Sequence, residues 1–101
     1  MIMTINKTQE NGKLIFVLEG RLDTTSAPKL QQELIPAFDE VKEVILDFKQ
    51  LAYISSAGLR VLLMGQKTSN AKSVPMSLFN VSEEIIEVFD MTGFSEMLTI
   101  V

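Results

Sequence analysis

With 101 residues, 47% of them apolar and 22% charged, the chain has the composition of one globular domain, here residues 1–101. It has no cysteine and no histidine, which excludes disulfides and thiolate chemistry and removes the commonest general base and transition-metal ligand. A net charge of −4 without a Lys or Arg cluster argues against direct binding of nucleic acid, and the lack of a long apolar run or signal sequence predicts a cytoplasmic protein with no membrane contact.

The first elements predicted along the chain are two strands. Residues 1–8 alternate loosely between apolar and polar side chains, as in an edge strand. Asn11 and Gly12 favour a tight hairpin turn, because both tolerate positive φ. Residues 13–19 are apolar on both faces, which is typical of a strand covered on both sides.

A helix is predicted to follow a loop at residues 20–23. Thr24 or Thr25 can cap its start, and Pro28 in its first turn is tolerated there. Pro36 is expected to kink or end the helix. Its apolar side chains recur at helical spacing, at Ala27, Leu30, Leu34 and Phe38.

The middle of the chain predicts a strand at residues 43–48 and a connector at residues 49–54. A second helix is predicted to begin at Ser55 or Ser56, since serine is a favoured N-cap, and to end near Asn70.

The last third predicts a strand, a helix and a final strand. Residues 75–79 form the strand, Ser82 caps the helix, Gly93 ends it in a left-handed conformation, and residues 97–101 form the final strand. The resulting order is β-β-α-β-α-β-α-β. It predicts a single-domain α/β fold, a mixed β-sheet with helices packed on it, because strands that alternate with helices pair in parallel.

Two hydroxyl-rich loops, residues 20–26 and 53–58, are expected at the carboxyl ends of parallel strands, where α/β sheets bind ligands and partners. Serines at such helix starts can be simple caps. Nucleophilic catalysis is not expected at Ser55 or Ser56, because no histidine and no suitably spaced lysine is available as a base. A serine at a helix N-terminus can instead carry a phosphate, which the free N–H groups and the helix dipole tolerate.

Gly58 falls in the first turn of the second predicted helix, where glycine is unfavourable. Close approach of another backbone would explain it, either within the domain or from a partner. On a helical wheel Leu59, Leu62 and Leu63 share one face, which is assigned to the sheet. The opposite face is unusually apolar, and either a partner or a neighbouring helix could cover it. That face holds Ala57, Val61, Met64, Gly65 and Thr68, flanked by Arg60 and Lys67.

Residues 46–48 and 53–63, with the sequence Tyr-Ile-Ser-Ser-Ala-Gly-Leu-Arg at their centre, resemble the signature of STAS domains. The resemblance is closest to the free-standing anti-sigma factor antagonists of bacterial partner-switching systems. Residues 20–27 are similar to the family's other motif loop, and residues 91–94 to its ending, so the resemblance covers essentially the whole chain. The family pattern is Asp-Ser-Ser/Ala-Gly-Leu. Ser56 matches its first serine, Ser55 replaces the aspartate, and Ala57 replaces the second serine.

The resemblance implies a binding module that is not an enzyme and carries no cofactor. Such a protein binds an anti-sigma factor that is itself a serine kinase, and so frees a sigma factor for transcription. The kinase phosphorylates the family serine, here Ser56, and the complex dissociates; a metal-dependent serine phosphatase resets the switch. The partner surface expected from the motif loops and the apolar helix face comprises Asp23, Thr24, Thr25, Ser55, Ala57, Gly58, Arg60, Val61 and Met64.

Two alternatives remain open at this stage. The same domain could be a subunit of another assembly, such as a stress-sensing complex or a lipid or anion transport complex. It could also bind a nucleotide or another small anion at the two hydroxyl-rich loops, although no phosphate-binding Gly-x-x-x-x-Gly-Lys-Ser/Thr motif is present.

Overall fold

The computed structural model describes residues 3–101, so the first two residues of the predicted edge strand lie outside it. Four strands form one sheet in the order β1-β2-β3-β4. The first two are antiparallel, and the other neighbours are parallel. This is the mixed sheet that the sequence predicts, and the α/β fold class is confirmed. The strands are β1 (Thr4–Glu10), β2 (Lys13–Leu22), β3 (Glu43–Ile54) and β4 (Met76–Phe79).

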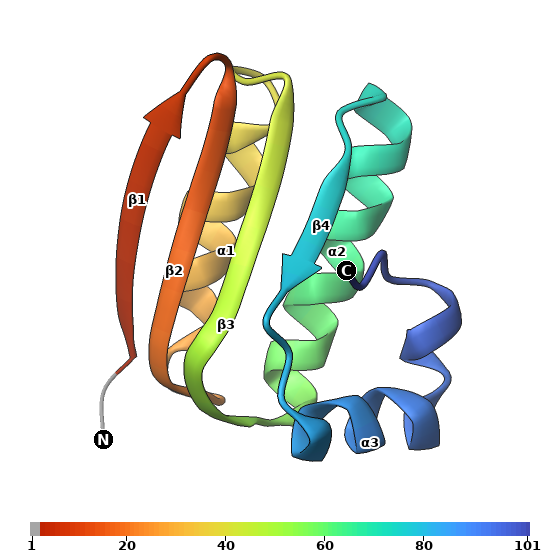
Figure 1. Ribbon diagram of the computed structural model, residues 1–101. Helices are drawn as coiled ribbons and strands as arrows, with labels where there is room; N and C mark the ends of the chain where they lie inside the picture. Colours follow the sequence, from red (N-terminus) through yellow and green to blue (C-terminus); the bar gives the residue numbers. More distant parts are fainter. Residues whose placement is uncertain (1–2) are drawn as a thin grey trace.

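The two long helices, α1 (Ala27–Ala37) and α2 (Ser56–Lys72), lie side by side on one face of the sheet (Figure 1). Helix α3 (Glu83–Thr92) follows β4 and lies below its end in Figure 1, and the chain then turns back through the short 3-10 helix η1 (Phe94–Glu96). Ser82 caps α3 by accepting the Ile85 N–H, and Gly93 ends it at φ 81°, both as predicted.

The core fills the space between the sheet and its helices. Every second side chain of β2 and β3 points into it, as strand geometry requires. The Phe89 ring of α3 packs on that of Phe48, with centroids 6.4 Å apart. Fully buried members of the core include Phe16, Leu18, Leu30, Leu34, Leu46, Phe48, Leu62, Leu78 and Phe89.

Several predicted boundaries were wrong. The connector expected at residues 49–54 is strand, because β3 keeps pairing with β2 through two register shifts up to Leu22 and Ile54. Helix α2 runs past Asn70 and ends at Lys72, with Ser73 in the left-handed conformation at φ 58°. The final predicted strand is reduced to one bridge between Leu78 and Ile100.

The expectation that residues 13–19 are covered on both sides was also wrong for the described part of the chain. Figure 1 shows both long helices on the same face, and no helix covers the other face of the sheet. Pro36, by contrast, acts as expected, because α1 ends one residue after it.

Candidate functional site

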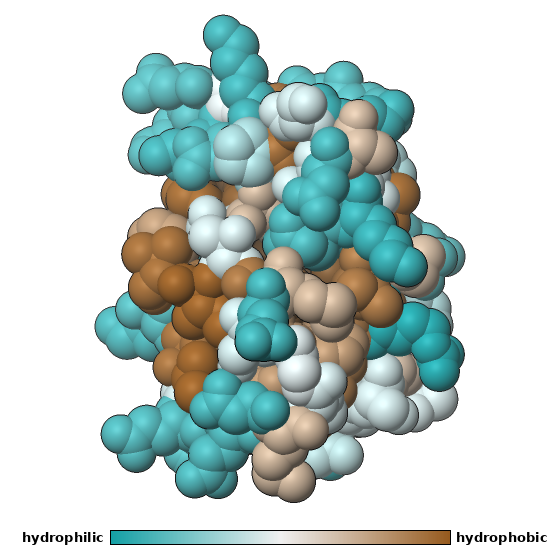
Figure 2. Space-filling view, turned by 90° about the vertical axis from the view of Figure 1, so that its right-hand side faces the viewer, coloured by the Kyte–Doolittle hydropathy of each residue, from teal (hydrophilic) through white to brown (hydrophobic). Residues whose placement is uncertain are grey.

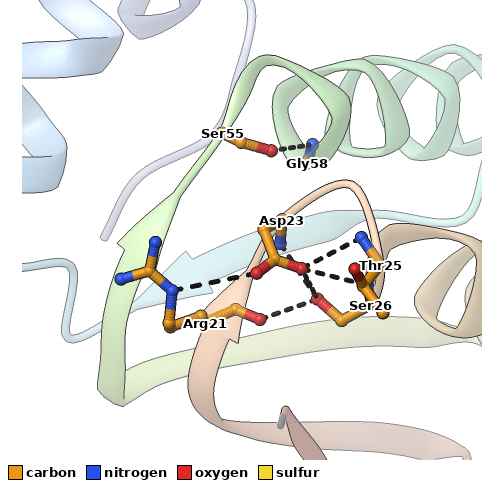
Figure 3. Close-up of polar contacts among 6 residues, drawn as sticks. All are labelled: Arg21, Asp23, Thr25, Ser26, Ser55 and Gly58. Atoms are coloured by element: carbon orange, nitrogen blue, oxygen red, sulfur yellow. Dashed lines mark hydrogen bonds and ion pairs between the residues drawn. The ribbon is translucent and has the colours of Figure 1, made fainter. Parts of the chain in front are cut away.

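The two predicted loops meet at the carboxyl ends of β2 and β3. Leu22 and Ile54 are neighbours in the register of these parallel strands, and the Ser55 N–H donates a hydrogen bond of 2.9 Å to the Leu22 carbonyl oxygen. The loop after β2 therefore lies next to the start of α2 (Figure 3).

Asp23 organises the loop that leads into α1. Its Oδ1 atom accepts the backbone N–H groups of Thr25 and Ser26, each at 3.1 Å. The Ser26 backbone hydrogen bond is the main reason why the pKa of Asp23 lies below its ordinary value, with smaller contributions from Thr25 and Arg21. The side chain of Asp23 is therefore a structural acceptor in this loop.

The cap predicted at Thr24 or Thr25 was wrong, because the N-cap of α1 is Ser26. The Ser26 hydroxyl does not cap the helix in the usual way. It donates to the Arg21 carbonyl oxygen at 2.7 Å and accepts the Asp23 N–H at 2.9 Å. These contacts turn the loop back on itself and leave Thr24 and Thr25 exposed.

Arg21 and Tyr53 were not singled out as site residues, but they lie beside this loop. The Arg21 guanidinium lies 3.9 Å from the centre of the Tyr53 ring, and its Nε atom is 3.8 Å from Asp23 Oδ2. Both residues fall inside the family's motif segments, and this position was the only feature of the sequence that could have identified them as site residues. The stacked arginine links the two loops through a cation–π contact.

The two serines at the start of α2 have different roles. Ser55 is the N-cap: its backbone is extended and its Oγ atom accepts the Gly58 N–H at 3.4 Å. Ser56 is the first residue of the helix and is exposed. Within residues 3–101 its hydroxyl has no hydrogen-bond partner. Ser55 is thus occupied by capping, and Ser56 is accessible.

Gly58 is buried because α2 begins directly against the end of β2. A Cβ atom at this position would lie 2.7 Å from Leu22 Cγ and 2.9 Å from Ile54 Cγ1. The alternative that the close approach occurs within the domain is therefore confirmed by the structure, and Gly58 is too buried to offer a partner much surface.

Helix α1 covers part of the helix face that was considered as a partner surface. Val61 is 3% exposed, so of the two alternatives for this face, cover by a neighbouring helix holds at Val61, and its inclusion among the expected partner residues was wrong in so far as it needs an open side chain. Gly65 is also buried, and a Cβ atom there would be 2.8 Å from Leu34 Cδ2 of α1. Ala57 and Met64 are half-buried, and Arg60 is exposed.

A shallow groove of about 240 Å³ remains between the first turns of α1 and α2. Val61 forms part of its wall, so it shapes the groove while contributing little exposed area. The groove brings together four of the predicted partner residues with three residues outside that predicted surface. It is lined by Thr24, Ala27, Pro28, Gln31, Ala57, Arg60 and Val61.

The described residues contain no group of three or more acidic side chains placed to hold a metal ion. In the same residues, no helix is long and apolar enough to span a membrane.

The STAS domain family model matches residues 4–101. The chain belongs to the STAS domain family. Among the relatives of this STAS domain, the candidate anti-sigma factor antagonist BtrV of Bordetella bronchiseptica is 36% identical over 95 residues, covering 93% of this chain and 80% of that protein. The anti-sigma-B factor antagonist of Bacillus subtilis is 27% identical over 100 residues, covering 99% and 92%.

The fold of this STAS domain is also that of solved antagonists. The anti-sigma factor antagonist SpoIIAA, in its unphosphorylated form, matches it with a TM-score of 0.78 at 18% identity, over 97% of this chain and 87% of that one. The sequence-level resemblance to this family is therefore confirmed.

Proposed function

We propose that this STAS domain is a cytoplasmic anti-sigma factor antagonist that binds an anti-sigma factor of the serine-kinase type. Phosphorylation of Ser56 by that kinase ends the complex, and a metal-dependent serine phosphatase restores it. The names of the curated relatives support the antagonist role.

The observation that carries the proposal is the difference between Ser55 and Ser56. A kinase needs a hydroxyl that can enter its active site, and Ser56 is exposed at the first helical position. The Ser55 hydroxyl is half-buried and bound to the Gly58 N–H. A phosphate on Ser56 would sit at the positive end of α2, where the fold tolerates a dianion.

The same phosphate would act strongly on a bound partner. Ser56 is exposed and directly precedes Ala57, which lines the groove together with Thr24 and Arg60. A partner that covers these features must bury the Ser56 side chain. A group with a charge of about −2 placed there carries a desolvation cost and repels acidic partner groups. Binding is lost without any change in the fold.

Phosphopeptide mapping tests the proposal. The protein is incubated with its cognate anti-sigma factor and ATP, and the modified residue is identified by mass spectrometry. We expect one phosphate, on Ser56, and no labelling of Ser56→Ala, while Ser55→Ala is still labelled. Labelling at Ser55 in the Ser56→Ala variant would contradict the assignment.

A further inference from the structure

One face of the sheet has apolar side chains but no helix from residues 3–101 over it. Residues that point away from α1 and α2 alternate with the core residues along β2 and β3. On adjacent strands Ile15 pairs with Ile45, and the next row holds Val17, Asp47 and Phe79. We name Ile15, Val17, Ile45 and Phe79 the outer patch.

The outer patch is separate from the core. Ile45 is only 6% exposed, yet it does not belong to the core cluster of the described residues, because its neighbours on the outer face shield it. Phe79 is 36% exposed, and Ile15 and Val17 are half-buried. Figure 2 shows this face in profile along its left edge, where apolar residues gather. An exposed apolar cluster on a sheet marks an interaction surface.

Charges of both signs frame the patch along the strands. At one end, Lys13 on β2 pairs with Glu43 on β3, with 4.0 Å between Nζ and Oε1. At the other end, Glu19 on β2 pairs in the register with Gln50 on β3, and Lys49 directly precedes Gln50, because the register shift after Val17 places both Lys49 and Gln50 between the core residues Phe48 and Leu51. Along β2 the basic residue Lys13 thus comes before the acidic residue Glu19. Along β3 the acidic residue Glu43 comes before the basic residue Lys49.

This arrangement is complementary to itself. A two-fold axis that runs parallel to the strands between β2 and β3 places β2 of one copy over β3 of another. Ile15 then faces Ile45 of the second copy, while Lys13 faces its Glu43 and Glu19 faces its Gln50, the residue that follows Lys49. Such a reciprocal pattern is what an interface between identical subunits requires. Asp47 would also lie in this dimer contact. Its Oδ1 atom already accepts hydrogen bonds from the Lys49 N–H and from the Asn80 side chain within its own chain.

We infer that the outer face of the sheet binds a second copy of this chain, in a face-to-face dimer of two sheets. Aligned sheets pack about 10 Å apart with their apolar side chains interdigitated, which the outer patch allows. Four strands spaced about 4.8 Å apart, with about 3.3 Å per residue from Lys13 to Glu19, offer a footprint of roughly 20 by 20 Å. That area is at the small end of specific interfaces, so we expect a dimer that dissociates on dilution.

The dimer would not compete with the proposed site for an anti-sigma factor. Ser56 and the groove beside Arg60 belong to the helices on the opposite face of the sheet (Figure 1). Each dimer would present two such sites, so it could engage a two-fold symmetric partner at both. The inference stands independently of whether Ser56 is phosphorylated.

The first test measures molecular mass by sedimentation over a wide range of protein concentrations. We expect a monomer–dimer equilibrium for the unmodified chain, and a folded monomer for Ile15→Lys, with a dissociation constant raised at least tenfold. The control Lys67→Glu changes a charge on α2 and should dimerise normally. A monomer at every concentration would overturn the inference, and so would a dimer that survives Ile15→Lys, since it would point to pairing along the β1 edge.

The second test exploits the charge pattern. Lys13→Glu leaves two carboxylates at one end of the patch, and Glu43→Lys leaves two ammonium groups, so each variant alone should dimerise at least tenfold more weakly. Mixed in equal amounts, the two variants should form a heterodimer, because each places its charges over the opposite charges of the other. An ion pair that acts only within one chain cannot be restored by mixing. Failure of the mixture to associate would count against this geometry.

Discussion

A Cβ atom added to Gly58 would lie 2.9 Å from the carbonyl oxygen of Leu22. The same carbonyl accepts the Ser55 N–H at 2.9 Å. The first turn of α2 therefore rests on the last residue of β2, and this contact fixes the position of Ser56 relative to the Asp23 loop. The geometry of the candidate site depends on the absence of a side chain at position 58.

Gly58→Ala should destabilise the protein, although alanine is the better helix former by about 1 kcal/mol. The added methyl group would press on a backbone oxygen that cannot move aside without breaking the β2–β3 contact. We expect a net loss of about 1–3 kcal/mol in the free energy of unfolding, measured by urea titration. Ser56→Ala, an exposed change in the same turn, serves as the control. An unchanged urea midpoint for Gly58→Ala would show that the end of β2 can shift away from the added methyl group at little cost in free energy.

Ser55→Ala and Ser56→Ala should separate stability from modification. Loss of the Ser55 cap leaves the Gly58 N–H without its acceptor, so we expect a cost of about 0.5–1 kcal/mol in unfolding free energy. Ser56→Ala should leave stability within about 0.5 kcal/mol, since an exposed hydroxyl is removed. Thermal melts of both variants check this. Equal losses for the two variants would argue that the two hydroxyls share the capping role.

Ser56→Asp should weaken binding to the anti-sigma factor by at least about 1–2 kcal/mol, roughly a five- to thirtyfold rise in the dissociation constant. An acidic residue at a helix start is well tolerated, so the melting temperature should barely change. Calorimetric titration measures the affinity, and Ser56→Asn provides an uncharged control of similar size. Wild-type affinity for Ser56→Asp would remove the charge-based explanation of the switch.

Val61→Glu and Arg60→Glu should behave differently despite being neighbours. Val61 is 3% exposed beneath α1, so a carboxylate there should cost about 3 kcal/mol or more and abolish cooperative unfolding near room temperature. Arg60→Glu changes an exposed groove residue, so we expect a folded protein with weaker partner binding. Circular dichroism melts and calorimetry distinguish these results. A stable Val61→Glu protein would mean that α1 moves away from α2 easily.

Acid should weaken the Asp23 loop in a predictable direction. The folded state favours the carboxylate of Asp23, so its pKa is lower than in the unfolded chain, and the folded protein binds the proton less readily. The stability that it contributes is therefore complete above the unfolded pKa of about 4 and is lost as the pH falls through the folded pKa. Relative to Asp23→Asn, the wild type should show an advantage in melting temperature at pH 6 that shrinks below about pH 4. A melting-temperature advantage of the wild type over Asp23→Asn that increases as the pH falls would contradict the predicted direction.

Local patterns in the sequence determined most of the elements and the place of the site. Ser82 and Gly93 were recognised as the ends of α3, because capping depends on a few neighbouring residues. The motif around Ser56 identified the family and the loop, and parallel strand order placed that loop beside Asp23. These features are encoded over short stretches of chain, where spacing and residue type are sufficient.

Tertiary structure alone decided what depends on contacts between distant segments. The helical wheel shows two apolar faces on α2, but only the packing of Leu34 against Gly65 shows that α1 covers one of them. The division of roles between Ser55 and Ser56 required the backbone angles at the end of β3. Similarly, Ile15 and Ile45 read as buried strand residues, yet both long helices lie on the other face of the sheet. Hydrophobic periodicity indicates that a side chain is shielded from water. It does not indicate whether a helix of the same chain or a partner protein shields it.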